Sequence, residues 1–235
     1  MTDSIIKETR AMVSQYMCNL DPSHDMLHVD RVVRLAMHLA NDCLTKGQRV
    51  DCEIVELAAL CHDVGDRKYY KGDASGGELI RPFLMEHGLT HERASLVARI
   101  VDHVGFRKEL AWNDDQDPQQ DVEWRKNCTE LHIVQDADKL DAIGAFGVLR
   151  CAAFSGAKNI PLFVPNLDPI KHMTKDEYEQ QTAKGKGTAI NHFHEKLFLL
   201  ADMMRTSKGK AMAKERTEFM RLFVRRIEEE YHMEL

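Results

Sequence analysis

Residues 59–70, ALCHDVGDRKYY, place a histidine and an aspartate directly after an apolar segment and just before a glycine. The residues that precede them repeat apolar side chains at helical spacing: Ile54, Leu57, Ala58 and Cys61. An imidazole or a carboxylate at the end of a buried face loses its hydration unless another group binds it. The dipeptide alone indicates little, because His24-Asp25 is a second His-Asp pair in the chain. The partners of His62 and Asp63 must therefore be sought elsewhere in the sequence.

The rest of the chain has a helical hydrophobic period, and we find no repeats and no convincing alternating β segment. The expected helices cover about 5–20, 27–44, 51–64, 76–87, 90–103, 129–154, a short segment from 174, 188–205 and 209–231. The sequence therefore predicts an all-α fold, a single helical bundle of eight or nine helices over residues 1–235.

Composition sets broad limits on location and partners. The 235 residues are 43% hydrophobic and 30% charged, as in ordinary globular proteins. No apolar run reaches the roughly 18–20 residues of a membrane span, and the N-terminus lacks the apolar region of a secretory signal. Six cysteines without a CxxC pair are typical of free thiols in a reducing compartment. We therefore expect a cytoplasmic protein that does not bind membranes.

The net charge of −6 argues against binding to a nucleic-acid polymer. It does not exclude a small anionic substrate, because a few local cations can hold one.

Two other stretches carry histidines or carboxylates on otherwise apolar helices, 24–32 and 135–142. Acidic side chains in such helices are costly unless they are paired or bind a cation. These stretches and the 59–70 segment are most simply explained if they converge on one cation. Imidazoles and carboxylates without thiolates suit Mn, Fe, Co, Ni, Zn or Mg better than a structural zinc site.

The ordered set HVDRV (28–32), CHDVGD (61–66) and DADKLDAIG (136–144) resembles the HD-domain superfamily of metal-dependent phosphohydrolases. The segment QDADKLDAIGAFGVLR and the tail at 192–223 are further similar to the small YpgQ-like HD hydrolases. This resemblance covers about residues 15–231. It implies one HD domain, with a metal-site core at about 20–155 and C-terminal helices at 174–231 that complete the bundle and the substrate pocket.

The resemblance also implies the metal ligands, namely His28, His62, Asp63 and one aspartate of the third stretch. His28 is preferred to His24 because the family ligand lies shortly before an Arg-Val pair, here Arg31-Val32. Asp138 is preferred to Asp136 because it stands in the Ala-Asp-x-Leu context of the family. The two aspartates point about 200° apart on a helix, so we expect only one to face the metal.

Six further residues are candidates for catalysis or substrate binding, and each has an ordinary structural alternative. His103 could bind phosphate or donate a proton to the leaving group, or it could only end a helix. Asp66 could orient a ligand or the attacking water, or it could belong to a turn. Four cations could bind phosphate, or they could be solvated or paired with protein carboxylates: Arg67, Lys68, Lys196 and Arg216.

The resemblance implies hydrolysis of a (deoxy)nucleoside triphosphate to a monophosphate and pyrophosphate, by a water activated on one divalent metal ion per chain. We expect Mn at this site, with Mg, Co, Ni, Fe or Zn as alternatives. Other readings are a nucleotidase or phosphodiesterase acting on another phosphorylated small molecule, a di-iron oxygenase on the same fold, and a non-catalytic nucleotide-binding module. The partner is then a small phosphorylated substrate, and a homodimer stays open.

Overall fold

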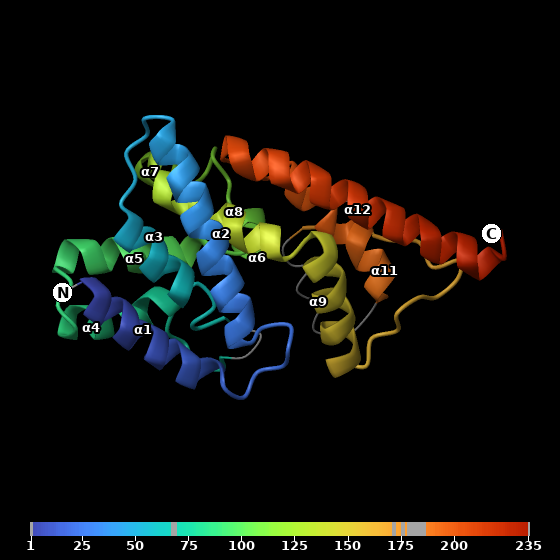
Figure 1. Ribbon diagram of the computed structural model, residues 1–235, viewed down its shortest axis with the longest axis horizontal. Coiled ribbons are helices and arrows are strands. Elements are labelled where there is room, and N and C mark those ends of the chain that lie inside the picture. The colour runs from blue at the N-terminus through green and yellow to red at the C-terminus, as the bar shows by residue number, and fades with distance from the viewer. Residues whose placement is uncertain (1, 67–69, 171–172, 175–176, 178–186, 235) are drawn as a thin grey trace. The chain divides into compact units, whose positions relative to one another are not determined.

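The computed structural model describes the chain except for residues 1, 67–69, 171–172, 175–176, 178–186 and 235 (Figure 1). The described residues form only helices and the segments that connect them, with no β-strand among them. The α-helices are α1 (Thr2–Met17), α2 (Met26–Thr45), α3 (Cys52–Cys61), α4 (Gly76–Glu86), α5 (His91–His103), α6 (Phe106–Leu110), α7 (Gln119–Asn127), α8 (Thr129–Asp141), α9 (Gly144–Ala157), α11 (Ala189–His192) and α12 (Ser207–His232). The predicted all-α fold is confirmed.

The chain divides into two compact units. The first contains residues 1–20 and 24–138, and the second contains residues 21–23 and 139–235. The single domain expected from the sequence stays a prediction.

Helix α3 is the centre of the first unit, where it packs against α1, α2 and α5. Its apolar residues from Val55 to Cys61 have no exposed surface, so the helix is buried on nearly every side. Asp51 caps its N-terminus by accepting a hydrogen bond from the Ile54 N–H (3.2 Å). The same carboxylate accepts two hydrogen bonds from the Arg93 guanidinium, at 2.5 and 3.1 Å. These contacts fix where α3 begins and therefore where His62 and Asp63 emerge at its other end.

Helix α4 lies against α5 through a close contact at its first turn (Figure 1). The Asp102 carboxylate accepts hydrogen bonds from the Gly77 N–H (2.8 Å) and the Ser75 hydroxyl (3.0 Å). Ser75 and Glu78 also form a capping box. A Cβ atom on Gly77 would lie 2.6 Å from the Ala98 carbonyl oxygen and would collide with Asp102 Oδ2. The contact therefore requires glycine at this position.

The single helix expected over 129–154 is wrong, because two helices occupy this range. Helix α8 ends at Asp141 and α9 starts at Gly144, which has a φ of 77°. That left-handed conformation suits glycine, and a Cβ there would lie 2.9 Å from Arg216 Cγ. A backbone position that admits only glycine thus separates the two helices.

The regular helix expected over 188–205 is also wrong. After α11 the chain forms a π-helix (Phe193–Leu197) and a 3₁₀-helix (Leu199–Ala201). Two short helices, α6 and α7, were not expected, because five and nine residues hold too few turns to show a clear hydrophobic period. At the start of the short helix expected from 174, the Thr174 N–H donates to Glu177 Oε2 (2.8 Å) and the Glu177 N–H donates to the Thr174 hydroxyl (3.3 Å), as in a capping box. Most of the expected segment lies outside the described residues.

Within the described ranges, no single helix is long and apolar enough to cross a membrane. Helices α8 and α9 pass that test of length and composition only as a bent pair, and much of α8 is buried in the protein.

We predict that Gly77→Ala lowers the free energy of unfolding by about 1–3 kcal/mol, because the added methyl group has no room between α4 and α5. Gly156→Ala in α9 is the matched control, since a Cβ there has no atom within 4 Å. The control should be neutral or stabilising by up to about 1 kcal/mol. Urea unfolding followed by circular dichroism measures both variants, and equal stability of the two would contradict the close contact.

Candidate metal centre

Three helices bring His28, His62, Asp63 and Asp138 together within the first unit. His28 lies in the first turn of α2, where the N-cap Asp25 carboxylate accepts a hydrogen bond from its backbone N–H (2.9 Å). His62 and Asp63 directly follow the last residue of α3. Asp138 lies near the end of α8. Each of these side chains therefore lies in the first turn, in the last turn or just after the end of a helix.

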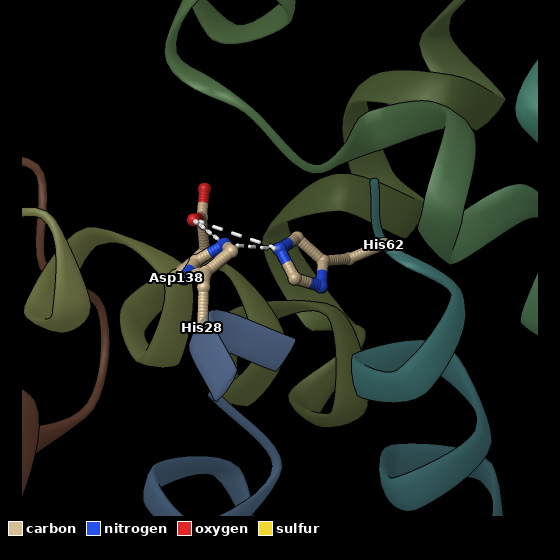
Figure 2. Close-up of side chains that lie close together, drawn as sticks. All are labelled: His28, His62 and Asp138. Atoms are coloured by element: carbon tan, nitrogen blue, oxygen red, sulfur yellow. Dashed lines mark hydrogen bonds and ion pairs between the residues drawn. The ribbon is translucent and has the colours of Figure 1, made fainter. Parts of the chain in front are cut away.

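The ring nitrogens of two histidines face each other and an aspartate oxygen (Figure 2). His28 Nε2 lies 3.1 Å from His62 Nε2. Asp138 Oδ1 is 4.0 Å from the first and 3.8 Å from the second. Ligand atoms at about 2.0–2.2 Å from a shared ion stand about 3–4 Å apart. The three atoms thus have spacings that would let them hold one metal ion.

The tautomer of His62 suits a metal ligand. Its Nδ1 lies 2.8 Å from the Ala59 carbonyl oxygen, which can only accept a hydrogen bond. The proton of a neutral imidazole therefore sits on Nδ1, and Nε2 carries the lone pair that faces His28 and Asp138. A backbone carbonyl that orients a histidine in this way is usual around metal sites.

Asp63 places a carboxylate oxygen beside the two imidazoles of the cluster. Its Oδ2 lies 3.3 Å from His28 Nε2 and 3.5 Å from His62 Nε2. No described donor meets this buried oxygen with ordinary hydrogen-bond geometry. Burial raises the pKa of Asp63, but the imidazoles of His62 and then His28 outweigh burial and hold the pKa well below its usual range. A buried, ionised oxygen without a regular donor is the kind of atom that a cation satisfies.

The alternatives to His28 and Asp138 lie outside this cluster. The His24 ring centroid is 5.9 Å from that of His28, so His24 is a neighbour of the cluster. Asp136 is fully buried and does not belong to the three residues that converge. Its charge acts on Cys43 of α2, as expected for a side chain that leaves α8 in a different direction from Asp138.

His103 and Asp66 are in the same unit as the cluster. His103 ends α5, and its Nδ1 lies 2.7 Å from the Arg99 carbonyl oxygen. Its ring packs against Trp124, with centroids 5.0 Å apart, and burial lowers the pKa of His103. Asp66 follows Gly65, whose N–H donates to the Tyr16 hydroxyl (3.0 Å). The charge of Asp66 raises the pKa of Tyr16 after burial has already raised it, so Asp66 lies close to this bond.

The four candidate phosphate-binding cations are less well placed by the structure. Arg67 and Lys68 lie outside the described residues. Lys196 belongs to the π-helix of the second unit, where its charge acts on Cys151. The Arg216 guanidinium donates to the Leu140 carbonyl oxygen (2.5 Å), and burial lowers its pKa while Asp141 raises it. Arg216 therefore has protein partners of its own in the second unit.

Two residues near the cluster were missed in the sequence. Tyr16 lies on the first expected helix, where nothing in the sequence marks it, and its hydroxyl accepts a hydrogen bond from the Gly65 N–H in the turn after Asp63. Lys108 lies in a five-residue helix that has no clear pattern, yet its ammonium is close enough to Asp63 and Asp66 for both charges to act on it. Only the fold brings these side chains together.

Residues 26–143 match the HD domain family. This range is half of the chain and contains all four converging side chains. The chain belongs to the HD-domain family. HD domains bind divalent metals, which agrees with the cluster formed by His28, His62 and Asp138.

Several relatives resemble the chain over nearly its full length. It is 32% identical to the protein YpgQ of Bacillus subtilis over 226 residues, which are 95% of this chain and 92% of YpgQ. A Lactobacillus plantarum structure shares 33% identity with a TM-score of 0.80 and covers 99% of both chains. The structure of YpgQ in complex with ADP has 29% identity and a TM-score of 0.68, over 98% of this chain and 97% of YpgQ. An HD-superfamily hydrolase from Bacillus thuringiensis has 26% identity and a TM-score of 0.69, over 99% of both chains. The fold is therefore that of HD-superfamily hydrolases.

We predict that Asp138→Asn weakens Mn²⁺ binding at least tenfold, because it removes a charged ligand atom, whereas Asp136→Asn changes it by less than about threefold. Mn²⁺ titration followed by electron paramagnetic resonance measures both variants, with helicity by circular dichroism as the folding check. Stronger loss in the Asp136 variant would contradict the assignment.

Proposed function

We propose that the protein is a metal-dependent phosphohydrolase that converts nucleoside triphosphates to nucleoside monophosphates and pyrophosphate. The observation that carries this proposal is the convergence of the imidazole nitrogens of His28 and His62 with a carboxylate oxygen of Asp138, beside the buried Asp63 Oδ2, which lacks a regular donor. An HD-domain chain with this donor set is suited to a divalent ion such as Mn²⁺.

The ligands proposed are His28, His62, Asp63 and Asp138. Two carboxylates balance the charge of a divalent ion, and the imidazoles are neutral ligands, so the filled centre would not repel an anionic substrate. A bound divalent ion lowers the pKa of water and neutralises charge that develops on phosphorus. The side chains of the protein must then bind the substrate and accept the proton that the attacking water loses.

His103 is proposed as a proton or hydrogen-bond acceptor. Because burial lowers its pKa, the imidazole is neutral near pH 7. The Nδ1–H of His103 donates a hydrogen bond to the Arg99 carbonyl oxygen. The lone pair of the neutral imidazole is therefore on Nε2. In this state His103 can take a proton from a water but has none on Nε2 to give to a leaving group. Asp66 is proposed to orient the same water, since it lies three residues after the proposed ligand Asp63.

The substrate class rests on the relatives. The B. subtilis YpgQ structure contains ADP, which supports a nucleotide substrate for a chain that is similar over 98% of its length. The triphosphate and the release of pyrophosphate rest on the resemblance to YpgQ-like hydrolases. Arg67, Lys68, Lys196 and Arg216 are proposed to contribute cations to substrate binding. A cytoplasmic location and the lack of binding to membranes or nucleic-acid polymers stay predictions from the sequence.

A di-iron oxygenase would need a second metal with additional ligands near the start of α4. That segment offers Glu78, whose carboxylate already accepts the Ser75 N–H (2.7 Å) in the capping box. His87 lies at the opposite end of α4, stacked on Phe83, with its Nδ1 2.8 Å from the Phe83 carbonyl oxygen. These contacts favour a centre with one metal ion.

We predict that the purified protein with Mn²⁺ releases pyrophosphate from nucleoside triphosphates. Phosphorus NMR on a panel of nucleoside mono-, di- and triphosphates separates pyrophosphate from orthophosphate. The Asp63→Asn protein is the control, because the loss of a metal ligand should abolish turnover. Release of orthophosphate alone would point to a nucleotidase or a stepwise phosphatase.

We also predict one tightly bound metal ion per chain and hydrolysis that proceeds without dioxygen. Elemental analysis gives the stoichiometry, and an oxygen electrode follows uptake during turnover. Two irons per chain together with oxygen consumption would overturn the hydrolase assignment in favour of the oxygenase.

A further inference from the structure

Lys108 has an unusual position at the end of α5. The short helix α6 is anchored by Phe106 and Glu109, each 8% exposed. The Lys108 side chain instead reaches back to the last turn of α5, where its Nζ donates to the Val101 carbonyl oxygen (2.8 Å). This end of α5 carries Asp102 and His103. The ammonium is thus held at a fixed place in the first unit.

The hydrogen-bond capacity of this ammonium is only partly used. A lysine Nζ has three donors, and in the described part of the chain Lys108 makes one hydrogen bond and no ion pair. Asp102 is the carboxylate that acts on it most strongly, but the Asp102 oxygens already accept from Gly77 and Ser75. Two N–H directions therefore remain for another acceptor.

The charges around Lys108 connect it to the metal cluster. Burial lowers the pKa of Lys108, and the carboxylates of Asp102, Asp66 and Asp63 oppose that shift, in this order. Asp63 is also one of the converging side chains of the cluster. Lys108 is half-buried, and a partly buried ammonium without an ion pair is stabilised when it binds an anion. A metal ion held by Asp63 would make its charge less available to Lys108.

We infer that Lys108 binds a phosphate group of the substrate next to the metal centre. This inference rests on the proposed function and gives the first unit a phosphate-binding cation of its own. The simplest alternative is a purely structural lysine that covers the Val101 carbonyl oxygen at the end of α5. The two roles differ in a measurable way, because only the first requires the positive charge when a phosphate binds.

The test compares Lys108→Met with Lys108→Gln, Lys108→Arg and the control Lys126→Met. Lys126 is 58% exposed and pairs with Asp114 at 2.8 Å, so it supplies an equal change of charge on the surface. Lys108→Gln removes the charge but keeps a donor for the Val101 carbonyl oxygen, and it serves if the methionine variant does not fold. Calorimetric titration with inorganic pyrophosphate follows saturation with Mn²⁺, and a separate titration gives the Mn²⁺ affinity.

Removal of the charge should weaken pyrophosphate binding about tenfold to hundredfold, the usual range for a charge-assisted hydrogen bond. Mn²⁺ affinity should stay within about threefold, Lys108→Arg should recover much of the pyrophosphate affinity, and the Lys126 control should match wild type. Unchanged pyrophosphate affinity in the folded Met or Gln variant would overturn the inference while leaving the metal centre intact. Wild-type protein that binds no Mn²⁺ would instead contradict the proposed function, and pyrophosphate titration without metal would still decide the role of Lys108.

Discussion

The structure of the first unit depends on one costly placement, an ionised carboxylate at the end of a helix that is buried on nearly every side. Helix α3 has no exposed apolar residue between Val55 and Cys61, and it delivers His62 and Asp63 into the interior. Asp63 Oδ2 is buried without a regular donor, and the nearby imidazoles of His62, His28 and His24 lower the pKa of its carboxyl against the effect of burial. Such a group destabilises the fold unless a cation meets it. The atoms that destabilise the metal-free protein are therefore the same atoms that would bind a divalent ion.

The surrounding contacts keep this arrangement rigid. The Asp25 cap sets the first turn of α2, and the Ala59 carbonyl oxygen sets the tautomer of His62. Arg93 joins α5 to the N-terminus of α3, while Asp102 joins α5 to the first turn of α4. Each of these bonds acts on a helix end, where free backbone groups need partners. The local chemistry of helix caps is thus also what positions the candidate ligands.

The sequence was a good guide where long helices have a regular period and clear caps. Helices α2, α3 and α5 follow from apolar spacing with Asp51 and Thr90 as N-caps. The break at Gly144 was not predicted in this way, because it lies in the left-handed backbone conformation of that residue (φ 77°), which the apolar spacing on either side does not reveal. The π-helix at 193–197 likewise has no period to reveal it. For the site, the three stretches with histidine and aspartate could be read directly, whereas Tyr16 and Lys108 gain their roles only from neighbours that folding brings to them.

The balance of charge is consistent with the anionic substrate that we propose for this acidic protein. The whole chain carries a net charge of −6, so attraction cannot come from its overall field. Two carboxylates would be cancelled by the divalent ion that they hold, and the filled centre would then be close to neutral. Of the carboxylates that act on Lys108, Asp102 is tied to α4 and Asp63 faces the cluster. Filling the metal site would weaken the effect of Asp63, while Asp102 and Asp66 would still act on the ammonium of Lys108, which would keep its two unused donors for a phosphate.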